Sequence, residues 1–189
     1  DKYFKYFSSV KRFCLSRFVF PMADGFVVIS EPLNQYIFKC KSARAHIIKI
    51  PIIVDYDYYQ IRIPQPDCQK PYILHSSTMN DNRDGISDVF TAVAEINSKS
   101  GKRIHFYLTS KLALAETWAN INQIIGEKNL KDYVHFLGDL NEQTLLAYQQ
   151  HCDMVVLNKV DSLQNRYNFA TKLGEYLSLG KPIITTLLG

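Results

Sequence analysis

Short apolar runs alternate with amphipathic segments along most of this chain, and this alternation constrains the fold more than any other feature. The apolar runs expected to form strands are 26–29, 46–50, 72–74, 103–108, 133–137, 153–157 and 183–184. The segments expected to form helices begin at Ser30 and Thr171 and also cover 85–98, 113–125 and 141–150. Short continuous apolar strands separated by helices are typical of a parallel sheet covered on both faces. The sequence therefore predicts an α/β fold with a Rossmann-like, doubly wound parallel sheet.

The length of 189 residues allows one ordinary domain with a real core, or one domain and a piece of another. We expect residues 1–22 to be the tail of a preceding domain or a linker helix, and residues 23–189 to form one domain. The hydrophobic content of 47% indicates a folded protein. The net charge of +4 favours anionic ligands or a membrane surface, but it is too small to indicate nucleic acid.

The sequence lacks the main motifs of several classes of protein. The chain has no G-x-G-x-x-G, P-loop or G-x-S-x-G motif, which argues against a nicotinamide dehydrogenase, an NTPase and an α/β-hydrolase. The four cysteines are widely spaced and the histidines lack metal-ligand spacing, so we expect no metal site. Free thiols, and the lack of an apolar run long enough to span a bilayer or of a signal-peptide pattern, favour the cytoplasm.

Residues 1–20 differ from the rest because aromatic residues interleave with lysines and arginines. One interpretation is a basic amphipathic helix that lies peripherally on a membrane. The other is a helix whose aromatic side packs on protein and whose basic side is solvated. We favour the second, because the apolar positions are scattered.

The stretch Asn168–Pro182 is the segment most informative about function. We expect Thr171 to cap a helix that ends near Gly180, with Lys172 and Glu175 on one face of its first turn. A helix N-terminus suits a phosphate, and a carboxylate one turn further in can accept hydrogen bonds from a ribose diol. The local chemistry thus suggests a nucleotide, although an exposed Lys/Glu pair is more often a solvated surface pair.

In a doubly wound sheet, ligands bind beyond the carboxyl ends of the strands. The loops that follow strands are therefore the ones expected to line the site: 75–84, 109–111, 137–141 and 157–171. The stretch Asn168–Pro182 begins at the end of the last of these loops, which places its helix N-terminus on the expected ligand side.

Five motifs in order resemble the retaining glycosyltransferases of family 4, which have the two-domain GT-B fold. They are Ala23–Ser30, Ile50–Tyr59, Asn82–Ile86, Val134–Gly138 and Asn168–Pro182, and together they span residues 23–186. The resemblance covers only the C-terminal, donor-binding domain of that family. It implies that the N-terminal acceptor domain and the final helix are absent, so we expect both ends of the chain to be truncations.

The resemblance also implies roles for individual residues. Arg83 stands where the family has a basic residue that grips the donor diphosphate, and Arg83 and Lys172 are the implied catalytic groups. Glu175 matches the glutamate that binds the ribose. The remaining implied donor-binding residues are Ser76, Ser77, Gly138, Leu140, Ser162, Gln164, Phe169, Ala170 and Thr171.

The chain departs from the family pattern in two loops. Ser76 and Ser77 lie where many members have a Gly-Arg pair, so hydroxyls replace a second cation. A first glutamate aimed at the sugar is also missing, since its position is Tyr167. The polar loop 161–167 is then the expected sugar-contacting segment, through Asp161, Ser162 or Gln164.

The resemblance implies a metal-independent glycosyltransferase that moves a sugar from a nucleoside diphosphate sugar to a saccharide or lipid-linked acceptor, as in polysaccharide biosynthesis. No cofactor is expected beyond the donor substrate, and the isolated chain is expected to be inactive. Two alternatives remain open. One is a GT-B-type sugar-nucleotide epimerase, and the other is a non-catalytic Rossmann-like domain that binds a nucleotide or a partner protein.

Overall fold

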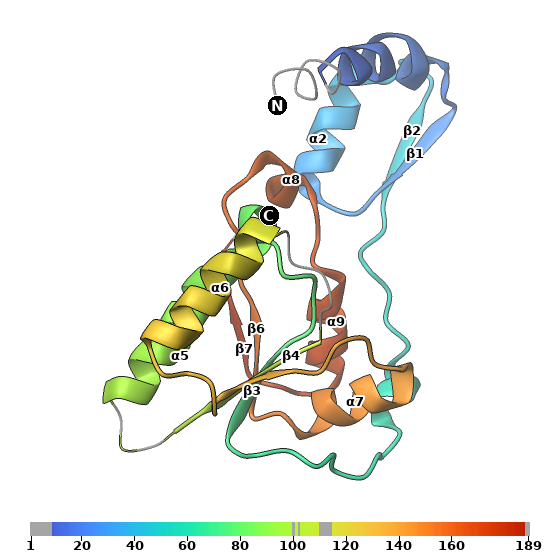
Figure 1. The fold of residues 1–189 in the computed structure, drawn as a ribbon. Helices are drawn as coiled ribbons and strands as arrows, with labels where there is room; N and C mark the ends of the chain where they lie inside the picture. The colour runs from blue at the N-terminus through green and yellow to red at the C-terminus, as the bar shows by residue number, and fades with distance from the viewer. Residues whose placement is uncertain (1–8, 100, 102, 110–114, 188–189) are drawn as a thin grey trace. The chain divides into compact units, whose positions relative to one another are not determined.

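The computed structural model describes residues 9–99, 101, 103–109 and 115–187 (Figure 1). The chain divides into two compact units. The first consists of residues up to 52 together with 163–169, and the second of residues 53–162 with the segment that starts at 170. The predicted boundary after residue 22 remains a prediction, and each unit is described by itself.

The second unit is built on a parallel sheet of five strands in the order β5-β4-β3-β6-β7. The strands are β3 (Tyr72–His75), β4 (His105–Leu108), β5 (Val134–Phe136), β6 (Met154–Leu157) and β7 (Ile183–Thr185). Leu74 of the central strand β3 is in register with Tyr107 of β4 and with Val155 of β6. The prediction of a doubly wound parallel α/β sheet is confirmed.

Helices cover both faces of this sheet (Figure 1). They are α5 (Ile86–Lys99), α6 (Ala115–Glu127), α7 (Glu142–His151) and α9 (Thr171–Ser178), and the unit also contains the short helices α3 (Tyr56–Gln60) and α4 (Asp81–Asp84). Side-chain caps begin two of the helices in this unit. Asp55 accepts a hydrogen bond from the Tyr58 N–H at the start of α3, and Asn141 accepts one from the Thr144 N–H at the start of α7.

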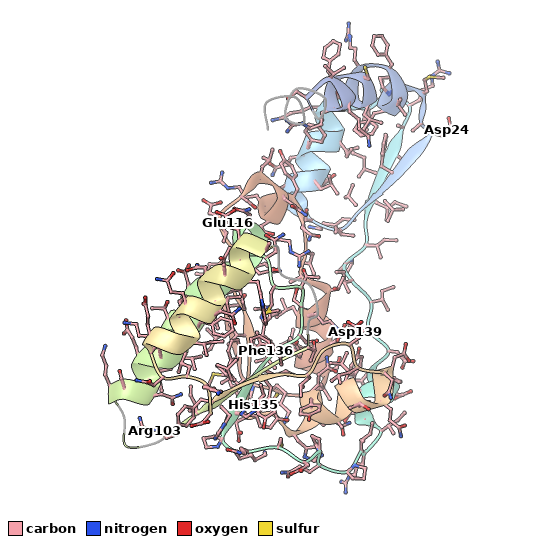
Figure 2. The ribbon with its side chains drawn as sticks, in the orientation of Figure 1. Asp24, Arg103, Glu116, His135, Phe136 and Asp139 are labelled. Carbon is pink, nitrogen blue, oxygen red and sulfur yellow. The ribbon has the colours of Figure 1, made fainter. Side chains whose placement is uncertain are left out.

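Successive strand residues point to opposite faces, and this alternation divides the core into two clusters. Ile73, Phe106 and Val156 pack with residues of α5 and α6 on one face. On the other face, Leu74 and Val155 pack with residues of α7 and α9. Phe136 lies on the edge strand β5 (Figure 2). Its ring contacts that of Trp118 from α6 edge to face. Both faces of the sheet are thus buried, as the continuous apolar runs predict.

The first unit contains a separate parallel sheet of two strands, β1 (Gly25–Val28) and β2 (His46–Lys49). The connecting helix α2 (Glu31–Cys40) begins as predicted, with the Ser30 hydroxyl accepting a hydrogen bond from the Leu33 N–H. The predicted strand at 26–29 is present as β1, but the prediction that it is buried is wrong for Val27, which is 66% exposed, whereas Val28 is buried. An apolar run indicates a strand, but it does not identify the surface that covers it.

The segment 163–169 also corrects the prediction of a polar loop. Leu163–Tyr167 forms a short helix, α8, which packs on the first unit. The Ser30 hydroxyl donates to the Tyr167 carbonyl over 2.8 Å, and the ring of Tyr167 contacts that of Tyr36 edge to face. Ser30 therefore both caps α2 and anchors α8, and this second role has no local sequence signal.

The N-terminal segment is helical from residue 9 to 14 and continues as the π-helix η1 (Leu15–Val19) and the short 3-10 helix η2 (Phe20–Met22). Phe13 and Phe18 are exposed and contact each other edge to face. The expected packing of the aromatic side on protein is therefore wrong for these two residues. Residues 1–8, which carry the rest of that expectation, lie outside the described residues. Within the described ranges, no helix has both the length and the apolar character needed to cross a membrane.

Candidate functional site

The strand order places a switch point beside the central strand. From β3 the chain adds β4 and then β5 on one side of the sheet, whereas β6 and β7 lie on the other side. At such a point the connections after neighbouring strands diverge and leave room for a ligand beyond their carboxyl ends. The segments that follow β3 and β6 are therefore the first place to look for a site.

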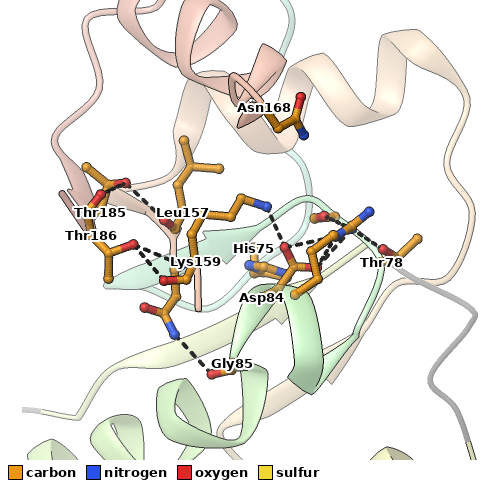
Figure 3. Close-up of polar contacts among 12 residues, drawn as sticks. His75, Thr78, Asp84, Gly85, Leu157, Lys159, Asn168, Thr185 and Thr186 are labelled. Atoms are coloured by element: carbon orange, nitrogen blue, oxygen red, sulfur yellow. Dashed lines mark hydrogen bonds and ion pairs between the residues drawn. The ribbon is translucent and has the colours of Figure 1, made fainter. Parts of the chain in front are cut away.

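A charged cluster joins these two segments (Figure 3). Asp84, at the end of α4, is fully buried. Its carboxylate accepts hydrogen bonds from the Arg83 guanidinium, at 3.0 Å from Nε and 2.8 Å from Nη2, and it also accepts one from Lys159 Nζ. A buried carboxylate requires such partners, because its desolvation in an apolar interior is costly.

Arg83 also reaches the loop that follows β3. Its Nη2 donates to the Ser77 hydroxyl over 3.1 Å and to the hydroxyl of Thr78. The structure thus brings Arg83 and Ser77 together, as the predicted site requires. Ser76 is buried and accepts a hydrogen bond from the Thr109 hydroxyl, so it ties β3 to β4.

His75 lies at the end of β3, beneath the charged cluster. Its Nδ1 is 3.2 Å from the Val156 carbonyl, which confirms the interpretation of His75 as a structural hydrogen-bonder. Burial lowers the pKa of His75, and the neighbouring Lys159 and Arg83 lower it further, although the Val156 carbonyl and Asp84 oppose them. Its Nε2 is buried and has no hydrogen-bond partner among the described residues.

The helix α9 begins one residue earlier than predicted. Ala170 is the N-cap, with an extended backbone, while Thr171 is already helical. The prediction that Thr171 caps the helix is therefore wrong, because a cap residue must have non-helical backbone angles. Ala170 has no side-chain acceptor for the first N–H groups, and within the described structure no side chain caps this end.

Lys172 and Glu175 form the predicted pair on the first turn of α9, with 2.9 Å between Nζ and Oε2. Gln149 of α7 donates to the same oxygen over 3.0 Å, and Tyr59 lies beside it. Burial first, and then the negative charge of Glu175, raise the pKa of Tyr59 to about 12. Glu175 is thus held by groups from three helices, unlike a solvated surface pair.

The other predicted donor-binding residues differ in their placement. Leu140 and Ala170 pack on the apolar cluster that contains Tyr176. Gly138, in that loop, has a positive φ of 70°. Ser162 belongs to the second unit, whereas Gln164 and Phe169 belong to the first. Roles of these residues in sugar binding remain predictions.

Sequence reasoning missed Lys159, Asp84 and Gln149. Lys159 had one usable signal, since it is a cation that follows an apolar strand by two residues on the ligand side of the sheet. Asp84 and Gln149 had no usable signal. Their contacts with Lys159 and Glu175 depend on tertiary packing. All four cysteines are free, and no group of three or more His, Cys, Asp or Glu side chains among the described residues could hold a metal ion.

Comparisons with known proteins agree with this fold. Residues 70–189 match the family model described as "Glycosyl transferases group 1". No curated protein sequence matches the chain. Solved structures do match, with sequence identities that show the fold alone.

Three of these structures illustrate the likeness. A glycosyltransferase from Rickettsia africae has 14% identity and a TM-score of 0.72, over 96% of this chain and 48% of its own. The Anabaena protein HepE, in complex with UDP and glucose, has 15% identity and a TM-score of 0.68, over 88% and 45%. The pneumococcal O-GlcNAc transferase GtfA, in complex with UDP and GlcNAc, has 15% identity and a TM-score of 0.62, over 88% and 31%. The chain therefore spans less than half of the length of each.

Proposed function

Because the chain belongs to the group 1 glycosyltransferases, we propose that it supplies the donor site of an enzyme that transfers a sugar from a nucleoside diphosphate sugar to a saccharide or lipid-linked acceptor. The transfer retains the configuration at the anomeric carbon. The observation that carries the proposal is the position of Arg83, a cation fixed beside the switch point of the sheet, where ligands of such folds bind.

The chemistry requires stabilisation of the negative charge that builds on the leaving diphosphate while the sugar becomes oxocarbenium-like. Preorganised cations and helix N–H groups supply it without moving during the reaction. Arg83 is held by Asp84 and Ser77, and Lys172 is held by Glu175, so both cations are preorganised. The open N–H groups at the start of α9 point along the helix axis and favour an anion.

The nucleoside is proposed to bind on the same side of the sheet. Glu175 accepts the ribose hydroxyls, and the backbone of Gly138 and Leu140 lies beside the base. Supporting this arrangement, Leu140 and Ala170 pack on one apolar cluster. We further propose that catalysis needs neither a metal nor a cofactor, and that the enzyme serves polysaccharide biosynthesis in the cytoplasm, with a preceding acceptor domain.

A calorimetric titration of the chain with UDP, GDP and ADP tests the proposal. At least one of the three is expected to bind more tightly than its nucleoside, because the diphosphate contributes charge-assisted hydrogen bonds. Arg83→Ala should remove most of that difference, while Lys99→Ala, at an exposed ion pair with Glu95, should not. If none of the diphosphates binds at millimolar concentration, the donor-site proposal is wrong.

A further inference from the structure

We propose that Lys159 is a second cation of the diphosphate site and that Asp84 is a positioning residue that holds Lys159 and Arg83 together. This inference rests on the proposed function and assigns roles to two residues outside the predicted set. The sequence comparison left the loop after β3 without a second cation, since Ser76 and Ser77 occupy its place. In the folded chain, that charge comes from the segment after β6 instead.

The segment 158–160 is joined residue by residue to the segment 83–85. Asn158 Nδ2 donates to the Gly85 carbonyl over 3.1 Å, and the Val160 N–H donates to the Arg83 carbonyl over 3.1 Å. Between these two contacts, Lys159 Nζ donates to the Asp84 carboxylate (Figure 3). Three consecutive contacts across the switch point thus fix where the two cations lie relative to each other.

The backbone of Lys159 is also anchored from the other side. Its N–H donates to the Thr186 hydroxyl over 3.1 Å, and that hydroxyl donates to the Lys159 carbonyl over 2.9 Å. Thr186 directly follows β7, so the segments after both neighbours of β6 in the sheet contribute to the position of Lys159. Such support from a second set of residues is typical of a preorganised site.

Charge and exposure indicate what this cluster binds. Two cations share one carboxylate, so these three groups together carry a net positive charge, and burial lowers the pKa of the neighbouring His75. The Asp84 side chain is fully buried, whereas those of Arg83 and Lys159 are 32% and 20% exposed. A ligand therefore meets the cations and not the carboxylate, which suits a diphosphate.

Substitution of Asp84 tests the inference, because its negative charge and its positioning of the two cations have opposite effects on diphosphate binding. As a negative charge beside an anion site, Asp84 weakens diphosphate binding, so Asp84→Asn should strengthen binding if charge alone matters. If Asp84 positions the two cations, its removal should weaken binding although the site becomes more positive. The direction of the change separates the two roles.

The experiment measures binding of the tightest of UDP, GDP and ADP, and of its nucleoside, to the whole chain. Lys159→Met should weaken diphosphate binding by about 10- to 100-fold, the range for a charged hydrogen bond, and leave nucleoside binding unchanged. Lys159→Arg should restore part of the loss. Lys99→Met is the matched control, because it removes a lysine from an exposed ion pair on α5.

Three results decide the matter. If the wild-type chain binds a diphosphate but Lys159→Met binds it as well as Lys99→Met does, the role of Lys159 is overturned while the proposed function stands. If Asp84→Asn binds more tightly, the positioning role is overturned. If the wild-type chain binds none of the three, the proposed function itself fails. Thermal melting checks folding, and if Asp84→Asn does not fold, the comparison of Lys159→Met with Lys159→Arg decides alone.

Discussion

At the scale of single residues, two carboxylates organise the site in different ways. Asp84 is fully buried between two cations, and removing one partner of such a pair leaves an uncompensated charge. Glu175 keeps 18% of its side chain exposed and shares one oxygen between Lys172 and Gln149. The exposed part of this carboxylate can still accept hydrogen bonds from a ligand.

Glu175→Gln tests that role, because it replaces an acceptor oxygen by a donor amide. We expect the affinity for a ribose diphosphate to fall by about tenfold or more, since hydrogen bonds to charged groups contribute about 1.5–3 kcal/mol. The affinity for the corresponding 2′-deoxynucleoside diphosphate should fall less. Calorimetry with both ligands measures the difference, and Glu95→Gln on the surface of α5 is the control. Equal losses for the two ligands would contradict ribose recognition.

At the scale of elements, the turn between α4 and α5 depends on one glycine. Gly85 has a positive φ of 53°, a conformation that side chains disfavour. A Cβ at this position would lie 2.7 Å from Asn158 Nδ2 and 3.1 Å from Val160 Cγ2. The close approach of segment 158–160 to α4 therefore requires glycine.

Gly85→Ala should lower the free energy of unfolding by about 1–3 kcal/mol, the range for a strained backbone position. Gly126→Ala is the matched control, because a Cβ there meets nothing within 4 Å and Gly126 lies inside α6. It should raise the stability by about 0.5–1 kcal/mol. Urea denaturation measures both, and a Gly85→Ala chain as stable as wild type would show that the turn can relax.

The open N-terminus of α9 leads to a second prediction at this scale. Ala170→Ser should add a capping hydrogen bond and stabilise the chain by about 0.5–2 kcal/mol. The same hydroxyl would occupy an N–H group that a phosphate needs, so the affinity for diphosphates should fall. Asp55→Ala, which removes the cap of α3, should reduce stability without that loss. A stabilised Ala170→Ser chain with unchanged affinity would exclude this helix end from the phosphate site.

At the scale of the whole molecule, buried and partly buried histidines couple folding to pH. Burial lowers the pKa values of His75, His105 and His135, so the unfolded chain takes up their protons at higher pH than the folded chain. Stability should therefore decrease as the pH falls through about 6.5, the usual histidine pKa, toward the lowered folded values.

Urea midpoints measured between pH 7.5 and 5 test this coupling. We expect the midpoint to fall with pH in the wild-type chain and to fall less in His75→Asn, which keeps a donor for the Val156 carbonyl. His46→Asn, at an exposed position, is the control. A steeper fall in His75→Asn than in wild type would show that His75 is not protonated on unfolding in this range.

Local features of the chain were predictable from the sequence because they depend on near neighbours. The Lys172–Glu175 pair follows from helical spacing, and the Ser30 cap follows from a hydroxyl before a Glu-Pro start. The place of Arg83 on the ligand side follows from its position after a strand. The cap of α9 was missed by one residue because the turn, and not the side chain type, decides where helical geometry begins.

The sequence by itself determined the class of fold, since the alternation of apolar runs and amphipathic segments specifies strands, helices and their buried faces. Only the tertiary structure decided which strands are neighbours, and hence that β1 and β2 form a separate sheet. It also decided that Lys159 meets Asp84, 75 positions apart in the chain. Periodicity records which side of an element is buried, but it contains no information about the partner that buries it.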